Sequence, residues 1–277
     1  MTSEYDTSQP SNSVEASSDS LVFAQPREQH PSVIEAFTFL LKAERWPLIL
    51  LIGGCSYLLS GMVPIVPVMF FSGYIMFLIE QQIRRPNAPV LFPNFDDTAA
   101  YLERGAWTVL AQIVLGILIS IPTTMFLIAL IIIAVMVGES GIAQDPSTQL
   151  MFVIIVVLSL GLLLLISLPL YMFTGILWFR SGMAGSFKDA FQFKWAWDFL
   201  KTCGLRIFFG FFCLALIATL LNLLGLLVLL VGTYFMGALS AIAGMHYLSQ
   251  WYDYYLAQGG TPIPLSPKLR LEKLAPE

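Results

Sequence analysis

The sequence predicts an all-α, polytopic integral membrane protein with six transmembrane helices and two cytoplasmic interfacial amphipathic helices. Of its 277 residues, 57% are hydrophobic and only 12% are charged, whereas about a quarter of a soluble domain is charged. Charged residues are nearly absent from several stretches longer than about 18 residues, which indicates membrane-spanning helices. The Lys and Arg residues fall outside these stretches, in a pattern that also predicts their orientation.

The two ends of the chain differ from its apolar middle. Residues 1–31 are rich in Ser, Thr, Gln, Asp and Glu, which predicts a disordered, acidic cytoplasmic tail because such a segment has little apolar surface to bury. This segment lacks the basic start and apolar core of a cleavable signal peptide. Residues 259–277 are Pro-rich and basic and predict a second cytoplasmic tail. The membrane domain is therefore expected over 32–258.

Two segments have the pattern of a helix that lies in the membrane interface, with apolar residues on one face and charged residues on the other. The first begins at Pro31, and the second covers about 187–199. The expected apolar faces consist of Val33, Ile34, Phe37, Leu40 and Leu41 in the first segment and of Phe187, Phe191, Trp195 and Phe199 in the second.

The apolar stretches divide into six spans. Residues 46–83 are nearly uncharged and are interrupted by Pro64 and Pro67. A single helix of that length would measure about 57 Å, nearly twice the ~30 Å hydrocarbon core, so a hairpin is required. The predicted spans are about 47–62, 65–82, 107–137 and 150–179, with spans five and six in 205–257 and their turn near 222–225.

The link at 84–105 is the richest polar loop. Within it, Asn94, Phe95, Asp96 and Asp97 have the residue types that begin a helix. The two carboxylates could also bind a cation, but the Asn and Pro that precede them favour the helix start.

An internal repeat is marked by one motif that occurs twice, as Glu35-Ala36-Phe37-Thr38-Phe39 and as Asp189-Ala190-Phe191-Gln192-Phe193. Each copy precedes a pair of predicted spans, which defines repeat units of about 33–95 and 187–267. Because both units start and end on the same side, they are expected to be related by an axis along the membrane normal.

The distribution of charge predicts the orientation. Six spans bring both chain ends to one side, and all 14 Lys and Arg residues fall in segments of that side. The positive-inside rule places these segments in the cytoplasm. The sequence therefore predicts a multi-pass protein of the cell membrane with cytoplasmic N- and C-termini.

Few residues point to chemistry. Glu80, Arg206 and Asp253 lie at predicted span ends, where we interpret them as snorkelling or solvated residues rather than as a functional pair. His246 has no acidic or Cys partner at ligand spacing. No nucleotide-binding or hydrolase motif occurs. We therefore expect no enzymatic activity, no catalytic residue, no cofactor or metal, and no nucleic-acid partner.

Four short motifs resemble a known family. They are Gly73-Tyr74, the segment 91–97, Gly105, and Asp189-Ala190-Phe191. With them the chain resembles, over about residues 33–257, an uncharacterised bacterial and archaeal membrane family known as domain of unknown function four-thousand-and-thirteen. The resemblance implies a six-helix integral membrane protein and supplies no activity.

Two functions fit these observations. The first is a non-enzymatic scaffold or assembly factor that contacts the lipid bilayer and other membrane or cytoplasmic proteins through its cytoplasmic face. The alternative is a transporter or channel for a small neutral or lipophilic solute, suggested by the repeat and by Pro122 and Pro169 within long spans. The candidate interaction residues are Phe37, Phe95, Asp96, Asp97, Phe191, Trp195 and Trp197.

Overall fold

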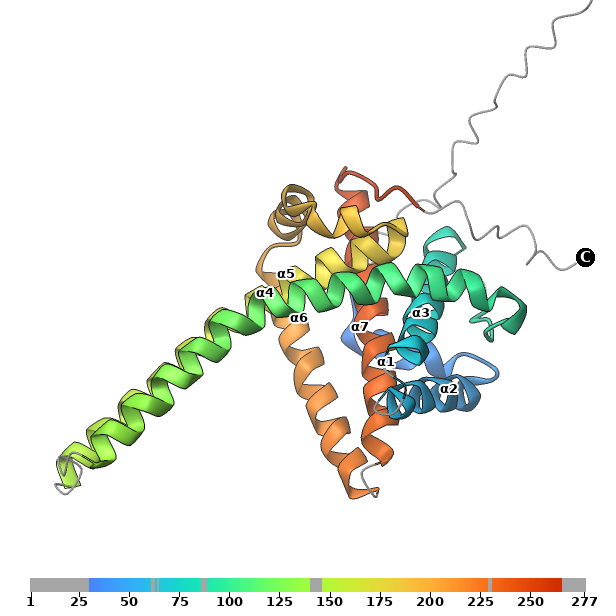
Figure 1. Ribbon diagram of the computed structural model, residues 1–277. Coiled ribbons are helices and arrows are strands. Elements are labelled where there is room, and N and C mark those ends of the chain that lie inside the picture. The colour runs from blue at the N-terminus through green and yellow to red at the C-terminus, as the bar shows by residue number, and fades with distance from the viewer. Residues whose placement is uncertain are drawn as a thin grey trace, which may run out of the picture.

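A computed structural model describes residues 30–60, 63, 65–85, 89–139, 146–228 and 231–265. Every regular element in these ranges is helical, which confirms the predicted all-α class. Residues 1–29 and 266–277, which hold most of the two predicted tails, lie outside them. The elements, shown in Figure 1, are α1 (Val33–Leu41), α2 (Trp46–Leu59), α3 (Val66–Arg84), η1 (Phe95–Asp97), α4 (Thr98–Glu139), α5 (Pro146–Ala184), η3 (Phe187–Phe191), α6 (Phe193–Leu227) and α7 (Val231–Ala257).

Helix α7 is at the centre of the folded body. It packs against α6, α2 and α1, and it also touches α3 and α5. Most of its second half is buried, and the aromatic residues Tyr247, Trp251, Tyr252 and Tyr255 belong to the hydrophobic core. Because protein covers α7 on several sides, its side chains need not be as uniformly apolar as those of a lipid-facing helix.

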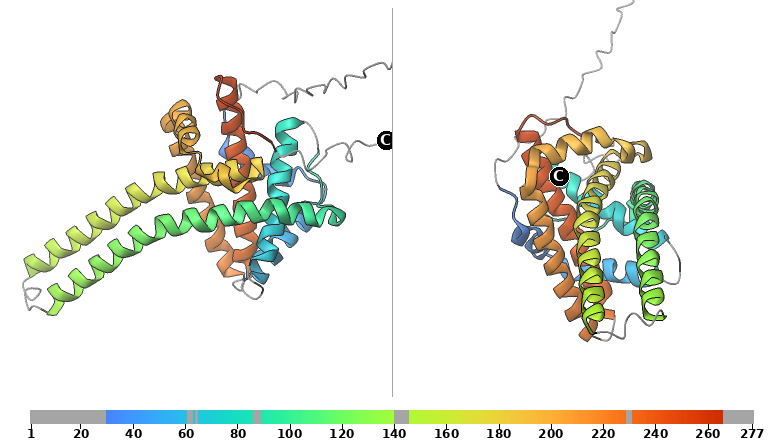
Figure 2. Two further views of the ribbon diagram at one scale, coloured as in Figure 1. Left: turned by 45° about the horizontal axis from the view of Figure 1, so that its top comes forward. Right: turned by 90° about the vertical axis from the view of Figure 1, so that its left-hand side faces the viewer.

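Helices α4 and α5 form a long antiparallel hairpin that projects from the body (Figures 1 and 2). The beginning of α4 packs on α3. Farther along, apolar side chains are exposed on every side of the hairpin: Met125 is 67% exposed in α4, and Leu158 is 67% exposed in α5. A helix that is apolar all round is stable in lipid or in a protein core, so this hairpin has the surface of a lipid-embedded element.

Four helices, α3, α4, α5 and α6, are long and apolar enough to cross a membrane. The two other predicted spans correspond to α2 and α7. Helix α2 has 14 residues and measures about 21 Å, less than the ~30 Å hydrocarbon core. Helix α7 has 27 residues, but its sequence contains many Tyr, Gly and Ser residues together with His246.

Glycines set the closest helix contacts. A Cβ on Gly73 would overlap the carbonyl oxygen of Tyr101, and a Cβ on Gly105 would overlap that of Met69, so α3 and α4 cross nearly backbone to backbone. Gly225 makes a similar approach to the backbone of Gly232 in α7. The predicted turn at 222–225 is therefore wrong: α6 continues to Leu227, and the glycine there serves packing.

The first amphipathic segment is helical, as predicted, but it is rotated from the expected face. Ala36, Phe39 and Leu40 are buried against the body, whereas Ile34 is 73% exposed and Leu41 51% exposed. The reason is that α1 packs on α7. Phe39 stacks on His246 with ring centroids 4.0 Å apart.

The second amphipathic segment is not one continuous helix. Residues 187–191 form the 3-10 helix η3, and α6 begins only at Phe193. As a result Phe187 and Phe191 pack on each other, 5.1 Å between ring centroids, while Trp195 and Phe199 belong to α6. A backbone break at Gly204, with φ 62° and ψ −156°, then separates this first part of α6 from the rest.

The segment predicted as the start of the C-terminal tail is partly packed on the body. Ile263 is 1% exposed and Leu265 9% exposed. The amide of Ile263 donates to the Tyr252 hydroxyl at 2.8 Å, and the Trp195 indole Nε1 donates to the Thr261 carbonyl at 2.9 Å. Residues 259–265 therefore belong to the folded domain, because the side chains of α6 and α7 satisfy their backbone.

Candidate functional site

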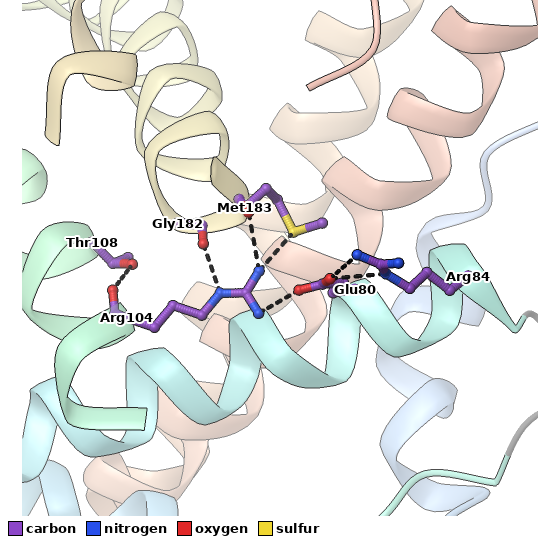
Figure 3. A network of polar contacts seen from close by, with 6 residues as sticks. All are labelled: Glu80, Arg84, Arg104, Thr108, Gly182 and Met183. Carbon is purple, nitrogen blue, oxygen red and sulfur yellow. Dashed lines mark hydrogen bonds and ion pairs between the residues drawn. The ribbon is translucent and has the colours of Figure 1, made fainter. Parts of the chain in front are cut away.

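Two clusters of buried charged residues lie near the end of α5. The first cluster joins α3, α4 and α5 (Figure 3). Glu80 in α3 is 2% exposed and Arg104 in α4 is 4% exposed. A 2.5 Å contact links Arg104 Nη1 to Glu80 Oε2. One turn farther along α3, Arg84 Nη2 lies 2.7 Å from Glu80 Oε1. One carboxylate thus faces two guanidinium groups, and the interpretation of Glu80 as a solvated or snorkelling residue is wrong.

Arg104 also binds the end of α5. Its Nε donates to the carbonyl of Gly182 at 2.8 Å, and its Nη2 donates to the carbonyl of Met183 at 3.2 Å. The last carbonyls of a helix have no partner within that helix, and a cation is favoured at this end of the helix dipole. Arg104 therefore ties α4 to α3 through Glu80 and to α5 through these carbonyls.

The second cluster joins α5, η3 and α6. The Arg180 Nη2 donates to Asp189 Oδ1 at 3.2 Å. The guanidinium carbon lies 4.7 Å from the centroid of the Trp195 ring, a distance typical of a cation–π interaction. Among the described residues, Arg180 Nε and Nη1 have no hydrogen-bond partner. The nearly buried Arg180 guanidinium is thus stabilised both by the Asp189 carboxylate and by the face of the Trp195 indole.

The two copies of the repeated motif differ in structure. Asp189 is in a 3-10 helix and pairs with a buried arginine. Glu35 is in an α-helix, and its carboxylate lies 3.7 Å from Lys42, with both side chains largely exposed. The following alanines, Ala36 and Ala190, are both buried. The motif therefore places a small buried residue in both copies, but it forms a buried ion pair only in the second.

This arrangement holds helices together. Each carboxylate in the two clusters is neutralised by arginine, and arginine does not lose its proton in proteins. Within the described ranges, no group of three or more His, Cys, Asp or Glu residues could hold a metal ion. His246 is stacked on Phe39, and its Nδ1 lies 3.1 Å from the Gln250 amide.

The sequence-predicted interaction residues lie at two separate places. Phe95, 60% exposed, and the exposed Asp96 and half-buried Asp97 are at the start of α4. The side-chain oxygen of Asn94 accepts a hydrogen bond from the backbone amide of Asp96 at 3.2 Å, as expected for a helix start. Figure 1 shows this end of α4 far from the start of α6.

At the start of α6, Phe191 is 39% exposed and Trp197 is 56% exposed. Trp195 is a core residue, 6% exposed, and Phe37 is half-buried against the same core. The structure therefore does not bring the predicted residues into one surface, and Trp195 is buried within the fold.

Sequence reasoning missed Arg104 and Arg180 as buried residues. The Glu80–Arg84 pair has the i,i+4 spacing of a helical ion pair and was accessible from the sequence. No such local signal links Glu80 to Arg104, because their contact depends on how α3 crosses α4.

The fold and these clusters define a class: an all-helical protein with several helices long and apolar enough to cross a membrane, joined at one end by buried ion pairs. Comparison with family models gives a match, over residues 57–245, to a family described as protein of unknown function, DUF4013. The match covers more than half of the chain, so the chain belongs to this family. No curated protein and no solved structure matches the chain.

The family match includes every residue of the two charge clusters and the glycines of the α3–α4 crossing. It leaves out α1 and the last turns of α7, so it is narrower than the resemblance over 33–257 suggested.

Proposed function

We propose that this protein crosses the cell membrane six times with both termini in the cytoplasm, and that it is a non-enzymatic scaffold or assembly factor. The observation that carries the proposal is the use of the buried charges. Glu80, Arg104, Arg180 and Asp189 bind one another or helix ends, so they brace the helices instead of lining a path or a reaction centre.

Topology supports the same assignment. The end of α4 and the start of α5 lie toward the lower side of the molecule in Figure 1, as do the end of α6 and the start of α7. The opposite side holds the ends of α3 and α5, where the basic residues Arg84, Arg85 and Arg180 lie. Basic residues on one side fit the positive-inside rule. The short α2 and the largely covered α7 are then the remaining two of the six spans.

The surface around Phe95, consisting of Phe95, Asp96 and Asp97, is the proposed contact with a protein partner. The Phe95 ring is held parallel to Phe70, 6.1 Å between centroids, and against Phe92 at 6.2 Å. A rigid exposed aromatic ring is a common energetic centre of a protein interface. The adjacent carboxylates suit a partner with basic side chains.

In-cell photo-cross-linking tests this surface. A photoreactive amino acid at position 95 is expected to give a discrete protein adduct, which the D96N/D97N variant weakens. The matched control is position 125, which is 67% exposed on the α4–α5 hairpin and is expected to contact lipid. The same adducts from both positions, or none from position 95, would contradict the proposal.

The α4–α5 hairpin favours the second candidate, a transporter or channel for a small neutral or lipophilic solute. Pro122 and Pro169 each interrupt the hydrogen bonding of one of its long helices, and such positions permit bending. Purified protein in liposomes is then expected to move a lipophilic solute. Absence of flux for neutral and lipophilic solutes across a broad panel would remove this candidate.

A further inference from the structure

We propose that the first part of α6 binds the phosphate headgroups of anionic phospholipids. The binding surface, called the α6 surface below, consists of Phe193, Lys194, Trp197, Lys201 and Arg206. The proposal rests on the membrane placement described above, but it does not depend on the protein partner of the Phe95 surface.

The backbone places this segment across the end of a membrane-crossing helix. At Gly204 the φ angle of 62° lies in the left-handed region and ψ is −156°, a conformation that favours glycine. The chain therefore turns there, and the first part of α6 runs crosswise to the rest (Figure 2, right). Such an orientation is expected for a helix that lies in the plane of the membrane surface.

The inner side of the segment is firmly attached. Trp195 packs edge-on against Tyr255, 5.7 Å between ring centroids, and Phe199 packs against the same ring at 5.1 Å. The Trp195 indole donates to Thr261, and Arg180 lies over its face. The orientation of the segment is thus set by the protein core, and its outer side is presented at a defined place.

The outer side combines cations with aromatic rings. Lys194, Trp197 and Lys201 follow one another at i, i+3 and i+7 and are all exposed, so they form one stripe along the helix. The Lys201 ammonium lies 5.6 Å from the centroid of the Trp197 ring. Trp and Lys are the residue types enriched at the headgroup level, with the indole among the glycerol groups and the ammonium reaching the phosphates.

The charges of this region favour an anionic ligand. Lys188, Lys194, Lys201 and Arg206 are exposed, and Asp198 is the exposed carboxylate among them. Asp189, in the 3-10 helix that precedes α6, is bound to Arg180. Most of the positive charge at the start of α6 is thus available to an anion.

A phospholipid fits better than an acidic protein because the stripe continues onto apolar surface. Directly after Gly204, Leu205 is 75% exposed, followed by Phe209 at 63% and Leu220 at 61%. These residues lie on the part of α6 that is apolar enough to cross a membrane. Acyl chains lying along this exposed side would place a phosphate at the level of Lys201 and Arg206.

The test uses the full chain purified in detergent and native mass spectrometry with added phosphatidylglycerol or phosphatidylcholine. We expect the protein to retain the anionic lipid preferentially. In K194Q/K201Q this preference is expected to fall about 25-fold, because each basic side chain near an anionic surface contributes roughly a five-fold factor. The matched control K42Q/R85Q removes two exposed cations elsewhere and is expected to retain most of the preference.

Three results would overturn the proposal: an unchanged preference in K194Q/K201Q, an equal loss in both double variants, and a protein instead of a lipid adduct from a photoreactive group at position 197. The last would identify an acidic protein as the ligand. Failure of the membrane placement is recognised separately, since the chain would then leave the membrane fraction without detergent.

Discussion

Gly73 and Gly105 face each other where α3 crosses α4, and neither position has room for a Cβ. The atoms in the way are the backbone carbonyl oxygens of Tyr101 and Met69, which cannot move aside as a flexible side chain can. We therefore expect Gly105→Ala to separate the two helices and to lower the free energy of unfolding by about 3 kcal/mol, at the upper end of overpacking costs. Thermal unfolding of the detergent-solubilised chain measures this.

Gly116→Ala is the matched control for this substitution. Gly116 is in the same helix, and a Cβ there would meet no atom within 4 Å. Alanine is the better helix former by up to about 1 kcal/mol, so the control is expected to be neutral or slightly stabilising. Equal melting temperatures for the two variants would show that the helices do not cross at Gly105.

Arg104→Met is expected to lower the free energy of unfolding by about 3 kcal/mol. The substitution leaves the buried Glu80 carboxylate with Arg84 alone, and loss of one partner of a buried ion pair typically costs about 3–5 kcal/mol. We take the lower end because Arg84 remains. Chemical denaturation of the full chain in detergent provides the measurement.

A double-mutant cycle separates the ion pair from the other bonds of Arg104. In E80Q/R104M the uncompensated charge is gone, so the double variant is expected to be more stable than R104M alone. It remains less stable than the wild type because the carbonyls of Gly182 and Met183 lose their donor. Costs that simply add would show that Glu80 and Arg104 are not coupled.

The two motif copies predict unequal effects of equivalent substitutions. Asp189→Asn removes the charge that faces Arg180, whose side chain is 8% exposed, and is expected to cost about 2 kcal/mol. Glu35→Gln weakens a 3.7 Å contact between exposed side chains and is expected to change stability by less than about 0.5 kcal/mol. Both are measured by thermal unfolding, and equal costs would contradict the difference between the copies.

Orientation is tested with a cysteine at position 140, between α4 and α5, in a variant without Cys55, Cys203 and Cys213. Since no Lys or Arg occurs in this link, we expect it outside the cell. A membrane-impermeant thiol reagent should therefore label the cysteine in intact cells. Labelling only after lysis would reverse the predicted topology.

The helical fold and the ends of its elements were largely predictable because they depend on local pattern. The 46–83 stretch divides at its prolines, as expected, and Asn94 begins the helical segment that leads into α4. Gly204 lies between the second amphipathic segment, predicted over about 187–199, and span five, predicted from residue 205. The sequence pattern therefore indicated a division there, whereas the direction in which the chain turns comes only from the Gly204 backbone angles, φ 62° and ψ −156°.

The candidate site was less predictable because it depends on contacts between distant elements. Arg180 and Trp195 are separated by 15 positions, and the 3-10 helix between them brings them together. Periodicity correctly placed Trp195 on the apolar face of its segment. It could not distinguish a face that meets the membrane interface from one that meets α7.

The stacking of Phe39 on His246 also bears on the order of events during synthesis. The buried face of α1 has its main partner in α7, about 200 residues later in the chain. At about 5–20 residues per second, a ribosome needs roughly 10 to 40 s to make the intervening polypeptide. During that interval Phe39 and Leu40 have no protein surface of α7 to cover them. The part of the body formed by α1 and α7 can therefore close only when translation has nearly finished.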